Sequence, residues 1–163
     1  MQDINTTCFF TGHRRIKKEL IENVKSLLKK EIINKYNNGI KTFISGCAKG
    51  FDLMASEIVL DLKKKECPDI ELLLYIPCYQ YEENYLTYEE RCKLLHFKAY
   101  CTDILIVDKI NNDNESIKTR NFKMVNDSYF GISYVNHKRS GAYQTIAYAK
   151  KQGKDVVNLA DLL

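Results

Sequence analysis

The stretch Thr6-Thr7-Cys8-Phe9-Phe10-Thr11-Gly12-His13-Arg14-Arg15 decides the class of fold. Residues 6–11 form a short apolar run that ends at a glycine, which is the pattern of a buried strand. The next apolar residues recur at helical spacing, at Leu20, Val24, Leu27, Leu28 and Ile32. Asn37-Asn38-Gly39 follows them and is typical of a helix end. These residues predict a strand, a tight turn and a long helix, in that order.

The same alternation of strand and helix continues along the sequence. Further strands are predicted at residues 41–45, 70–76, 103–107, 131–135 and 155–159, further helices at 51–65, 83–100, 118–126 and 142–152, and a polar loop at 111–115. The strand segments are continuous apolar runs, as expected when helices cover both faces of a sheet. We therefore predict a single α/β domain over residues 1–163, a Rossmann-like three-layer sandwich with a mainly parallel sheet.

Composition and charge exclude several classes of protein. Hydrophobic residues make up 45% of the 163 residues and charged residues 28%, which is ordinary for a globular domain. No apolar run approaches the ~20 residues of a membrane span, and the first residues lack the pattern of a signal peptide. The six cysteines form no Cys-x-x-Cys pair, so we expect reduced thiols in a cytoplasmic protein, with no metal, cofactor or membrane partner. Because the net charge is only +4, nucleic acid is not an expected partner.

The loops after the predicted strands carry the functional signal, because ligands of parallel α/β sheets bind beyond the carboxyl ends of the strands. Glycine or small residues occur in three such loops, at residues 11–15, 45–52 and 139–145. These loops allow backbone N–H groups to approach an anion at a helix N-terminus. Arg14 and Arg120 would add charge-assisted hydrogen bonds to a phosphate. The sequence therefore predicts a phosphorylated, nucleotide-like ligand.

Each of these signals also has a purely structural interpretation. Gly12 and Gly46 would serve equally well as tight turns between strand and helix. Asp52 is favoured at the start of a helix by the helix dipole alone. The tyrosines that follow the third strand either stack on a base or pack a helix onto the sheet, and they are Tyr79, Tyr81, Tyr85 and Tyr88. Both interpretations stay open at this point.

Together, the loops resemble a known family. The segments that carry the resemblance are Thr11-Gly12-His13-Arg14, Ser45-Gly46-Cys47-Ala48-Lys49-Gly50-Phe51-Asp52, Ile76-Pro77-Cys78, Arg120-Asn121-Phe122-Lys123-Met124-Val125, Ser128 and Gly141. Their order and spacing resemble the YpsA-like branch of the SLOG superfamily, which is related to the Rossmann-like domains of LOG enzymes and DprA. The resemblance implies a Rossmann-like fold with a nucleotide-type pocket at the strand ends.

The resemblance also implies which residues bind the ligand. They are Thr11, Gly12, His13, Arg14, Ser45, Gly46, Ala48, Gly50, Asp52, Arg120, Asn121, Ser128, Ser140, Gly141 and Ala142. Two of them depart from the family pattern, because Ser140 and Ala142 stand where relatives have the first glycine and the threonine of Gly-Gly-Thr. We expect the added Cβ of Ser140 to reshape the phosphate contacts.

Three kinds of function follow from the resemblance. The first is binding of a nucleotide-derived ligand, such as an ADP-ribose-like molecule or a signalling nucleotide, which the protein senses or sequesters without turnover. The second is LOG-like hydrolysis of a nucleoside monophosphate, and the third is a YpsA-like regulatory interaction. The first is favoured because the glutamate that LOG enzymes place beside the departing base is replaced here by Gln144 or Thr145. A homodimer or higher homo-oligomer is also expected from the resemblance.

Overall fold

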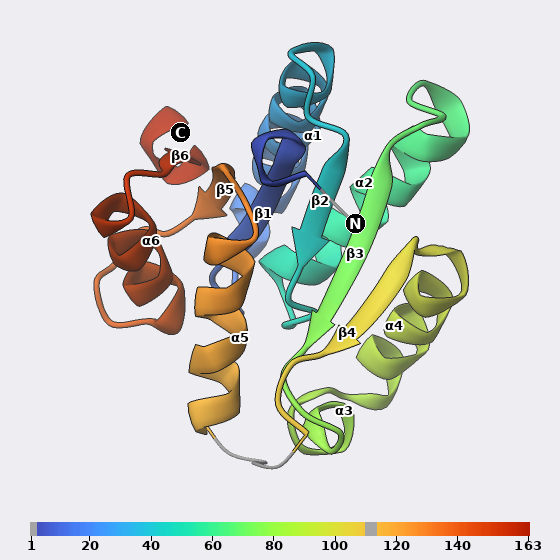
Figure 1. Ribbon diagram of the computed structural model, residues 1–163, viewed down its shortest axis with the longest axis vertical. Coiled ribbons are helices and arrows are strands. Elements are labelled where there is room, and N and C mark those ends of the chain that lie inside the picture. The colour runs from blue at the N-terminus through green and yellow to red at the C-terminus, as the bar shows by residue number, and fades with distance from the viewer. Residues whose placement is uncertain (1–2, 110–113) are drawn as a thin grey trace.

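Six parallel strands form one sheet in the computed structural model, which describes residues 3–109 and 114–163 (Figure 1). The sheet order is β4-β3-β2-β1-β5-β6, and each neighbouring pair is parallel. The strands are β1 (Thr7–Gly12), β2 (Thr42–Ser45), β3 (Glu71–Ile76), β4 (Asp103–Ile106), β5 (Phe130–Tyr134) and β6 (Asp155–Asn158). The predicted parallel sheet is confirmed.

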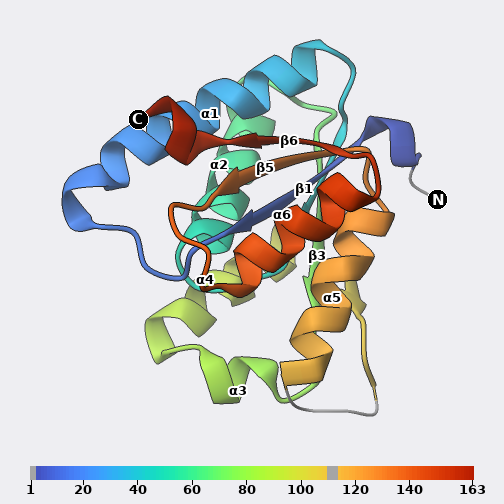
Figure 2. The same ribbon diagram turned by 90° about the vertical axis from the view of Figure 1, so that its left-hand side faces the viewer.

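Helices cover both faces of this sheet and make the three predicted layers (Figure 2). One face carries α1 (Ile21–Asn37), α2 (Phe51–Lys65) and α4 (Tyr88–Tyr100), and the other carries α5 (Asn114–Asn126) and α6 (Gly141–Lys151). The short helix α3 (Tyr81–Tyr85) precedes α4, and 3-10 turns occupy Ile4–Thr6, Lys18–Leu20 and Leu159–Leu162. The Rossmann-like α/β class is therefore confirmed.

The core consists of two apolar clusters, one on each face of the sheet. Phe10 belongs to the larger cluster beneath α1, α2 and α4, and its ring stacks on that of Phe43, with the centroids 5.6 Å apart. Phe9 belongs to the smaller cluster beneath α5 and α6. Successive side chains of a strand point to opposite faces, so consecutive phenylalanines fill both clusters. This explains why the strands are continuous apolar runs.

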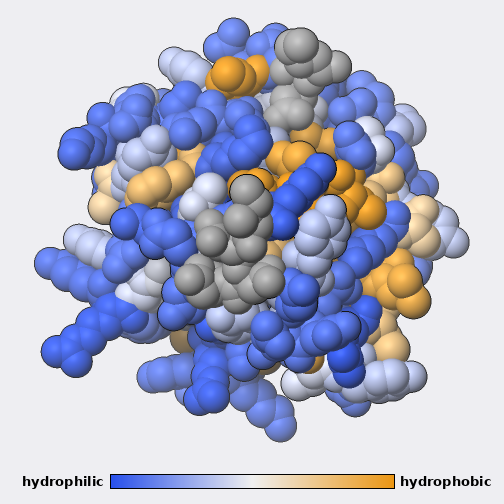
Figure 3. Space-filling model, turned by 60° about the horizontal axis from the view of Figure 1, so that its bottom comes forward, coloured by the Kyte–Doolittle hydropathy of each residue, from blue (hydrophilic) through white to orange (hydrophobic). Residues whose placement is uncertain are grey.

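All six strands point the same way, so their carboxyl ends meet at one end of the molecule, at the bottom of Figure 1. Figure 3 turns this end toward the viewer and shows that hydrophilic side chains cover most of it. No helix within residues 3–109 and 114–163 is long and apolar enough to cross a membrane. All six cysteines are free thiols.

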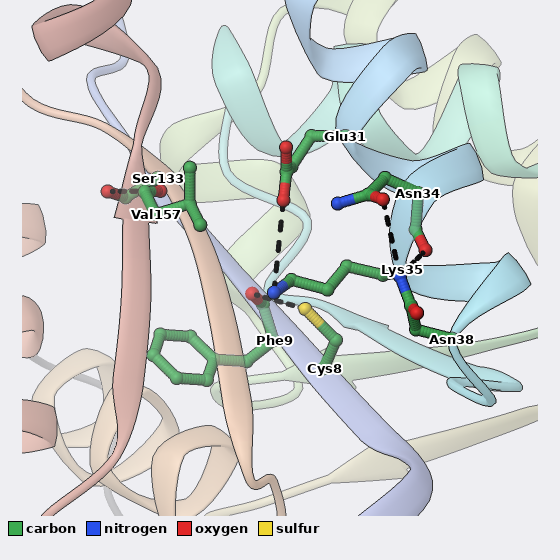
Figure 4. Close-up of polar contacts among 8 residues, drawn as sticks. All are labelled: Cys8, Phe9, Glu31, Asn34, Lys35, Asn38, Ser133 and Val157. Carbon is green, nitrogen blue, oxygen red and sulfur yellow. Dashed lines mark hydrogen bonds and ion pairs between the residues drawn. The ribbon is translucent and has the colours of Figure 1, made fainter.

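Polar contacts occur within β1 and at the end of α1 (Figure 4). The Cys8 thiol donates a weak hydrogen bond to the carbonyl oxygen of Phe9 over 3.7 Å, and burial raises its pKa, so it stays protonated. At the end of α1 the Asn38 side-chain amide donates to the carbonyl oxygen of Asn34 over 2.7 Å. This contact caps the helix at the predicted Asn37-Asn38-Gly39 stop.

The structure differs from the sequence prediction at the single helix expected over residues 83–100. Two helices occur there, because Thr87 begins a new one. The Thr87 hydroxyl accepts a hydrogen bond from the Glu90 N–H over 3.2 Å, and the Thr87 N–H donates to the Glu90 carboxylate over 2.8 Å. This reciprocal pair is a capping box, whose Thr-x-x-Glu pattern is legible in the sequence. Residues 111–113 of the predicted loop lie outside the described residues, and Asn114 is already helical.

Candidate functional site

A cavity of about 550 Å³ lies at the carboxyl ends of the strands, where the sheet order reverses. The chain leaves β1 toward α1 on one face of the sheet, whereas it leaves β5 toward α6 on the other face. Such a switch point leaves a crevice between the two connections, and open α/β sheets bind ligands there. The cavity is thus where the topology leads one to look for a ligand.

Eleven of the fifteen predicted ligand-binding residues line this cavity. They are Thr11, Gly12, His13, Arg14, Ala48, Asp52, Arg120, Asn121, Ser140, Gly141 and Ala142. Four segments that are distant in the sequence supply them: the end of β1, the start of α2, the middle of α5 and the start of α6. The fold brings the predicted residues to one place, while their contact with a ligand stays a prediction.

The β1 end contributes a buried histidine whose ring is fixed by the protein. His13 is 6% exposed, and its Nε2 accepts a hydrogen bond from the Asn136 N–H over 2.9 Å. Its ring stacks on that of His137 with the centroids 4.0 Å apart. Burial and the neighbouring His137 lower the pKa of His13. His13 is therefore neutral at pH 7, with its proton on Nδ1.

Two glycines of the second loop are required by the packing of the protein itself. A Cβ at Gly46 would lie 2.8 Å from Cζ of Arg120 and 2.9 Å from Oδ2 of Asp52. Gly50 has a φ of +81°, and a Cβ there would lie 2.5 Å from the carbonyl oxygen of Arg14. Neither glycine lines the cavity. The structural interpretation of these two glycines therefore accounts for them without a ligand.

Asp52 lies in the first turn of α2, where it forms a buried wall of the cavity. The residue is 4% exposed, and its Oδ2 accepts a hydrogen bond from the Ala48 N–H over 3.3 Å. Removal from water raises the pKa of Asp52 to about 6, although the nearby Arg120 and Arg14 charges act in the opposite direction. Burial thus outweighs the attraction of both arginines.

Arg120 lies beside Asp52 and lines the cavity, and the protein engages two of its three guanidinium nitrogens. It is 2% exposed, its Nε donates to Oδ1 of Asn121 over 2.8 Å, and its Nη1 donates to the carbonyl oxygens of Gly46 and Tyr75. These contacts join α5 to the ends of β2 and β3. We infer that Arg120 positions the cavity wall, a role that sequence reasoning did not assign to it.

The fourth wall is the N-terminus of α6. Ser140 is its N-cap, and the Ser140 hydroxyl accepts a hydrogen bond from the Tyr143 N–H over 3.0 Å. Gly141 and Ala142 follow in the first turn and line the cavity. The serine that replaces a family glycine therefore stabilises the helix start.

Several cavity residues were not among the predicted ones. They are Arg15, Lys49, Ile117, His137 and Arg139. Lys49 and Arg139 lie in the loops that the sequence singled out, so their positive charge was a usable signal. His137 had no such signal, because only the fold brings it to His13.

Ser45 and Ser128 are the two other predicted residues that do not line the cavity. Ser45 lies beneath the cavity, where its hydroxyl donates to the Asp52 carbonyl oxygen over 3.2 Å and accepts from the Cys47 N–H. Ser128 precedes β5, and the next residue, Tyr129, bonds Thr7 at the start of β1. Ser128 therefore lies at the amino end of the strands, so the structure does not bring it to the cavity.

Of the tyrosines after β3, two are packed within the protein and two are exposed. Tyr81 is buried and stacks on Tyr85 with the ring centroids 5.3 Å apart. The guanidinium of Arg120 lies 5.8 Å from the centre of the Tyr81 ring. Tyr79 and Tyr88 are exposed. No tyrosine in the described part of the chain lines the cavity, so packing explains Tyr81 and Tyr85.

Two DprA structures share this fold. The chain superposes on DNA processing protein A (DprA) from Streptococcus pneumoniae with a TM-score of 0.67 and 17% identity, covering 93% of this chain and 49% of that chain. For DNA processing protein A from Helicobacter pylori the TM-score is 0.63 and the identity 17%, covering 94% of this chain and 64% of that chain. At this identity the likeness shows the fold.

The Helicobacter pylori structure concerns the single-stranded DNA binding mode of that protein. This finding corrects the expectation that nucleic acid is not a partner. The expectation was based on the small net charge, which does not reveal how basic residues gather once the chain is folded.

Sequence comparison leads to the same family as the motifs. A UPF0398 protein of Ligilactobacillus salivarius (strain UCC118) is 29% identical over 86 residues, which are 50% of this chain and 46% of that protein. The chain thus spans about half the length of this relative. The family model named YpsA, and described as the YspA SLOG family, matches residues 9–158. Because that match covers all six strands except the first two residues of β1, and every wall of the cavity, the chain belongs to the YspA SLOG family.

Proposed function

We propose that the cavity binds the phosphate of a nucleotide-derived small ligand, such as an ADP-ribose-like molecule or a signalling nucleotide, which the protein senses or sequesters. The observation that carries the proposal is the charge of the lining, which holds five basic residues and one acidic residue. The basic residues are Arg14, Arg15, Lys49, Arg120 and Arg139. The N-terminus of α6 adds backbone N–H groups without intrahelical partners, which favour an anion.

We further propose that the ligand is bound without LOG-type hydrolysis. Gln144 is exposed, and the hydroxyl of Thr145 donates to the Gly141 carbonyl oxygen over 2.7 Å. Neither side chain is an anion that would stabilise an oxocarbenium-like transition state. Two carboxylates elsewhere in the chain that would be able to replace the LOG glutamate are Glu57 and Asp127. Glu57 lies against α4, and Asp127 bonds Tyr75 and Lys123 away from the cavity. Chromatography of AMP and GMP after long incubation with the protein should therefore show no free base. Released base would instead support LOG-like hydrolysis as the function.

Calorimetry with AMP, GMP and ADP-ribose tests binding. We expect at least one of them to bind, and Arg14→Ala and Arg139→Ala each to weaken it by about tenfold or more, since a hydrogen bond to a charged group contributes about 1.5–3 kcal/mol. Both arginines are exposed, so neither change should disturb folding. Lys30→Ala removes an exposed charge from α1 and is the matched control. Absence of binding by all three nucleotides, or equal affinity in all variants, would overturn the proposal.

Single-stranded DNA is a second candidate ligand. The specific observation in its favour is the shared fold with the Helicobacter pylori protein, together with the basic lining of the cavity. A fluorescent oligo(dT) titrated by anisotropy tests it. Binding of the oligonucleotide that AMP does not displace would favour DNA, and displacement by AMP would place a single nucleotide unit in the cavity.

A further inference from the structure

One buried oxygen in the cavity wall has no hydrogen-bond partner. It is Oδ1 of Asp52, which is unpaired within the described ranges 3–109 and 114–163, whereas Oδ2 is bonded to the Ala48 N–H. Buried polar atoms in folded proteins are nearly always paired. An ionised carboxylate only accepts hydrogen bonds, so the group that would complete this site is a donor.

Backbone donors near the carboxylate leave Oδ1 unpaired within the described residues: the Ala48 N–H bonds Oδ2, and the Gly46 N–H, which also lowers the pKa of Asp52, makes no hydrogen bond to Oδ1. Arg120 donates from Nε and Nη1 to Asn121, Gly46 and Tyr75. The guanidinium of Arg14 lies 5.8 Å from the centre of the Tyr85 ring. Because Asp52 lines the cavity, the cavity is where an additional donor would come from.

The donor is not the phosphate of the ligand. A phosphate is an anion, and a carboxylate beside it would repel it, whereas Arg14, Arg139 and the start of α6 attract it. Arg14 and Asp52 line the same cavity, and the charge of Arg14 lowers the pKa of Asp52, so a phosphate at Arg14 has Asp52 nearby. In a nucleotide the group next to the phosphate is the sugar, whose hydroxyls are donors. The amino group of a base lies one sugar farther away.

Building on the proposed function, we infer that Asp52 accepts a hydrogen bond from a ribose hydroxyl of the bound nucleotide and thereby selects ribonucleotides. The phosphate is held by the basic rim and α6, and the sugar is read by the buried carboxylate. An acidic residue that accepts from ribose hydroxyls is a recurring solution in doubly wound α/β folds. Here the unpaired Oδ1, rather than a dinucleotide motif, indicates it.

The test compares AMP with 2′,3′-dideoxy-AMP by calorimetry at pH 7.5. The wild-type protein is expected to bind AMP about tenfold or more tightly, because the dideoxy compound leaves Oδ1 unpaired. In Asp52→Asn, which keeps the shape and removes the charge, the preference should fall to within about threefold. Asp61→Asn makes the same change farther along α2, at an ion pair with Lys65 outside the cavity, and should keep the full preference.

The outcomes separate this inference from the proposed function. Equal binding of AMP and 2′,3′-dideoxy-AMP by the wild-type protein overturns the ribose contact and leaves phosphate binding intact. A full preference retained in Asp52→Asn also overturns it. Inosine monophosphate lacks the amino group of AMP, so its weak binding beside tight dideoxy-AMP binding would assign the donor to the base. Binding of neither nucleotide and of no inorganic phosphate rejects the proposed function itself. The comparison of AMP with 2′,3′-dideoxy-AMP on the wild-type protein tests the ribose contact even if Asp52→Asn does not fold.

Discussion

At the scale of single residues, Asp52 shows how a buried carboxylate lowers the stability of the fold. Its pKa is raised from 3.8 to about 6, chiefly by burial. The folded state therefore holds more protons than the unfolded state between pH 4 and 6, and stability falls as the pH rises through this window. A shift of about two pKa units corresponds to roughly 3 kcal/mol.

Asp52→Asn removes this penalty, because the amide keeps the shape without the charge. We expect the variant to be more stable than the wild-type protein at pH 7–8, by up to about 3 kcal/mol, with the difference vanishing near pH 4. Urea denaturation across this pH range measures it, with Asp61→Asn as the control that shows no such trend. Lower stability of Asp52→Asn at every pH would mean that the Arg120 charge depends on Asp52 more than burial penalises it. Higher stability with weaker ribose preference would mark Asp52 as a binding residue.

Arg120 is expected to behave as a structural residue when it is changed. Arg120→Ala leaves the carbonyl oxygens of Gly46 and Tyr75 without their donor and the Asp52 carboxylate without its neighbouring cation. The unfolding free energy should fall by about 3 kcal/mol or more, since each buried acceptor that loses its donor costs about 1–3 kcal/mol. The exposed Arg139→Ala should lie within about 0.5 kcal/mol of the wild type. If Arg120→Ala unfolds like the wild type but no longer binds phosphate, Arg120 is a ligand contact instead.

At the scale of elements, the start of α6 combines a structural and a binding role in one turn. Ser140 caps the helix, so Ser140→Ala should lower stability by about 1 kcal/mol, whereas Ser140→Gly, which restores the residue of the family pattern, should cost only a few tenths. Chemical denaturation of the two variants side by side makes the comparison. Unchanged stability of Ser140→Ala would show that the hydroxyl is not what stabilises the helix start.

At the scale of the whole molecule, folding gathers basic residues at one cavity although the chain as a whole has little net charge. The net charge is only +4, but five basic residues and one acidic residue line one cavity. Salt screens exposed charges over about 8–10 Å, so we expect AMP affinity to fall several-fold between 0.05 and 0.5 M NaCl. The double variant Arg14→Ala/Arg139→Ala should flatten this dependence, and Lys30→Ala should not. A salt dependence unchanged in the double variant would place the anion elsewhere.

The sequence by itself determined the architecture, because its signals are local. Apolar runs such as residues 70–76 predict buried strands, and all six predicted strands agree with the observed ones to within one residue at each end. The strands predicted at residues 6–11 and 131–135 are each shifted by one residue, to Thr7–Gly12 and Phe130–Tyr134. The helix predicted at 51–65 is α2 itself. The resemblance then indicated the loops that surround the cavity.

Only the tertiary structure decided what each side chain in those loops does. Arg120 is predicted to meet phosphate, and only the structure shows that Nη1 of its guanidinium also donates to the backbone carbonyls of Gly46 and Tyr75. Ser128 belongs to the same motif, but the direction of α5 carries it to the opposite end of the strands. The unpaired Oδ1 of Asp52 is a property of burial, which depends on segments that are far apart in the sequence. Periodicity encodes local elements, whereas contacts between distant loops exist only once the chain has folded.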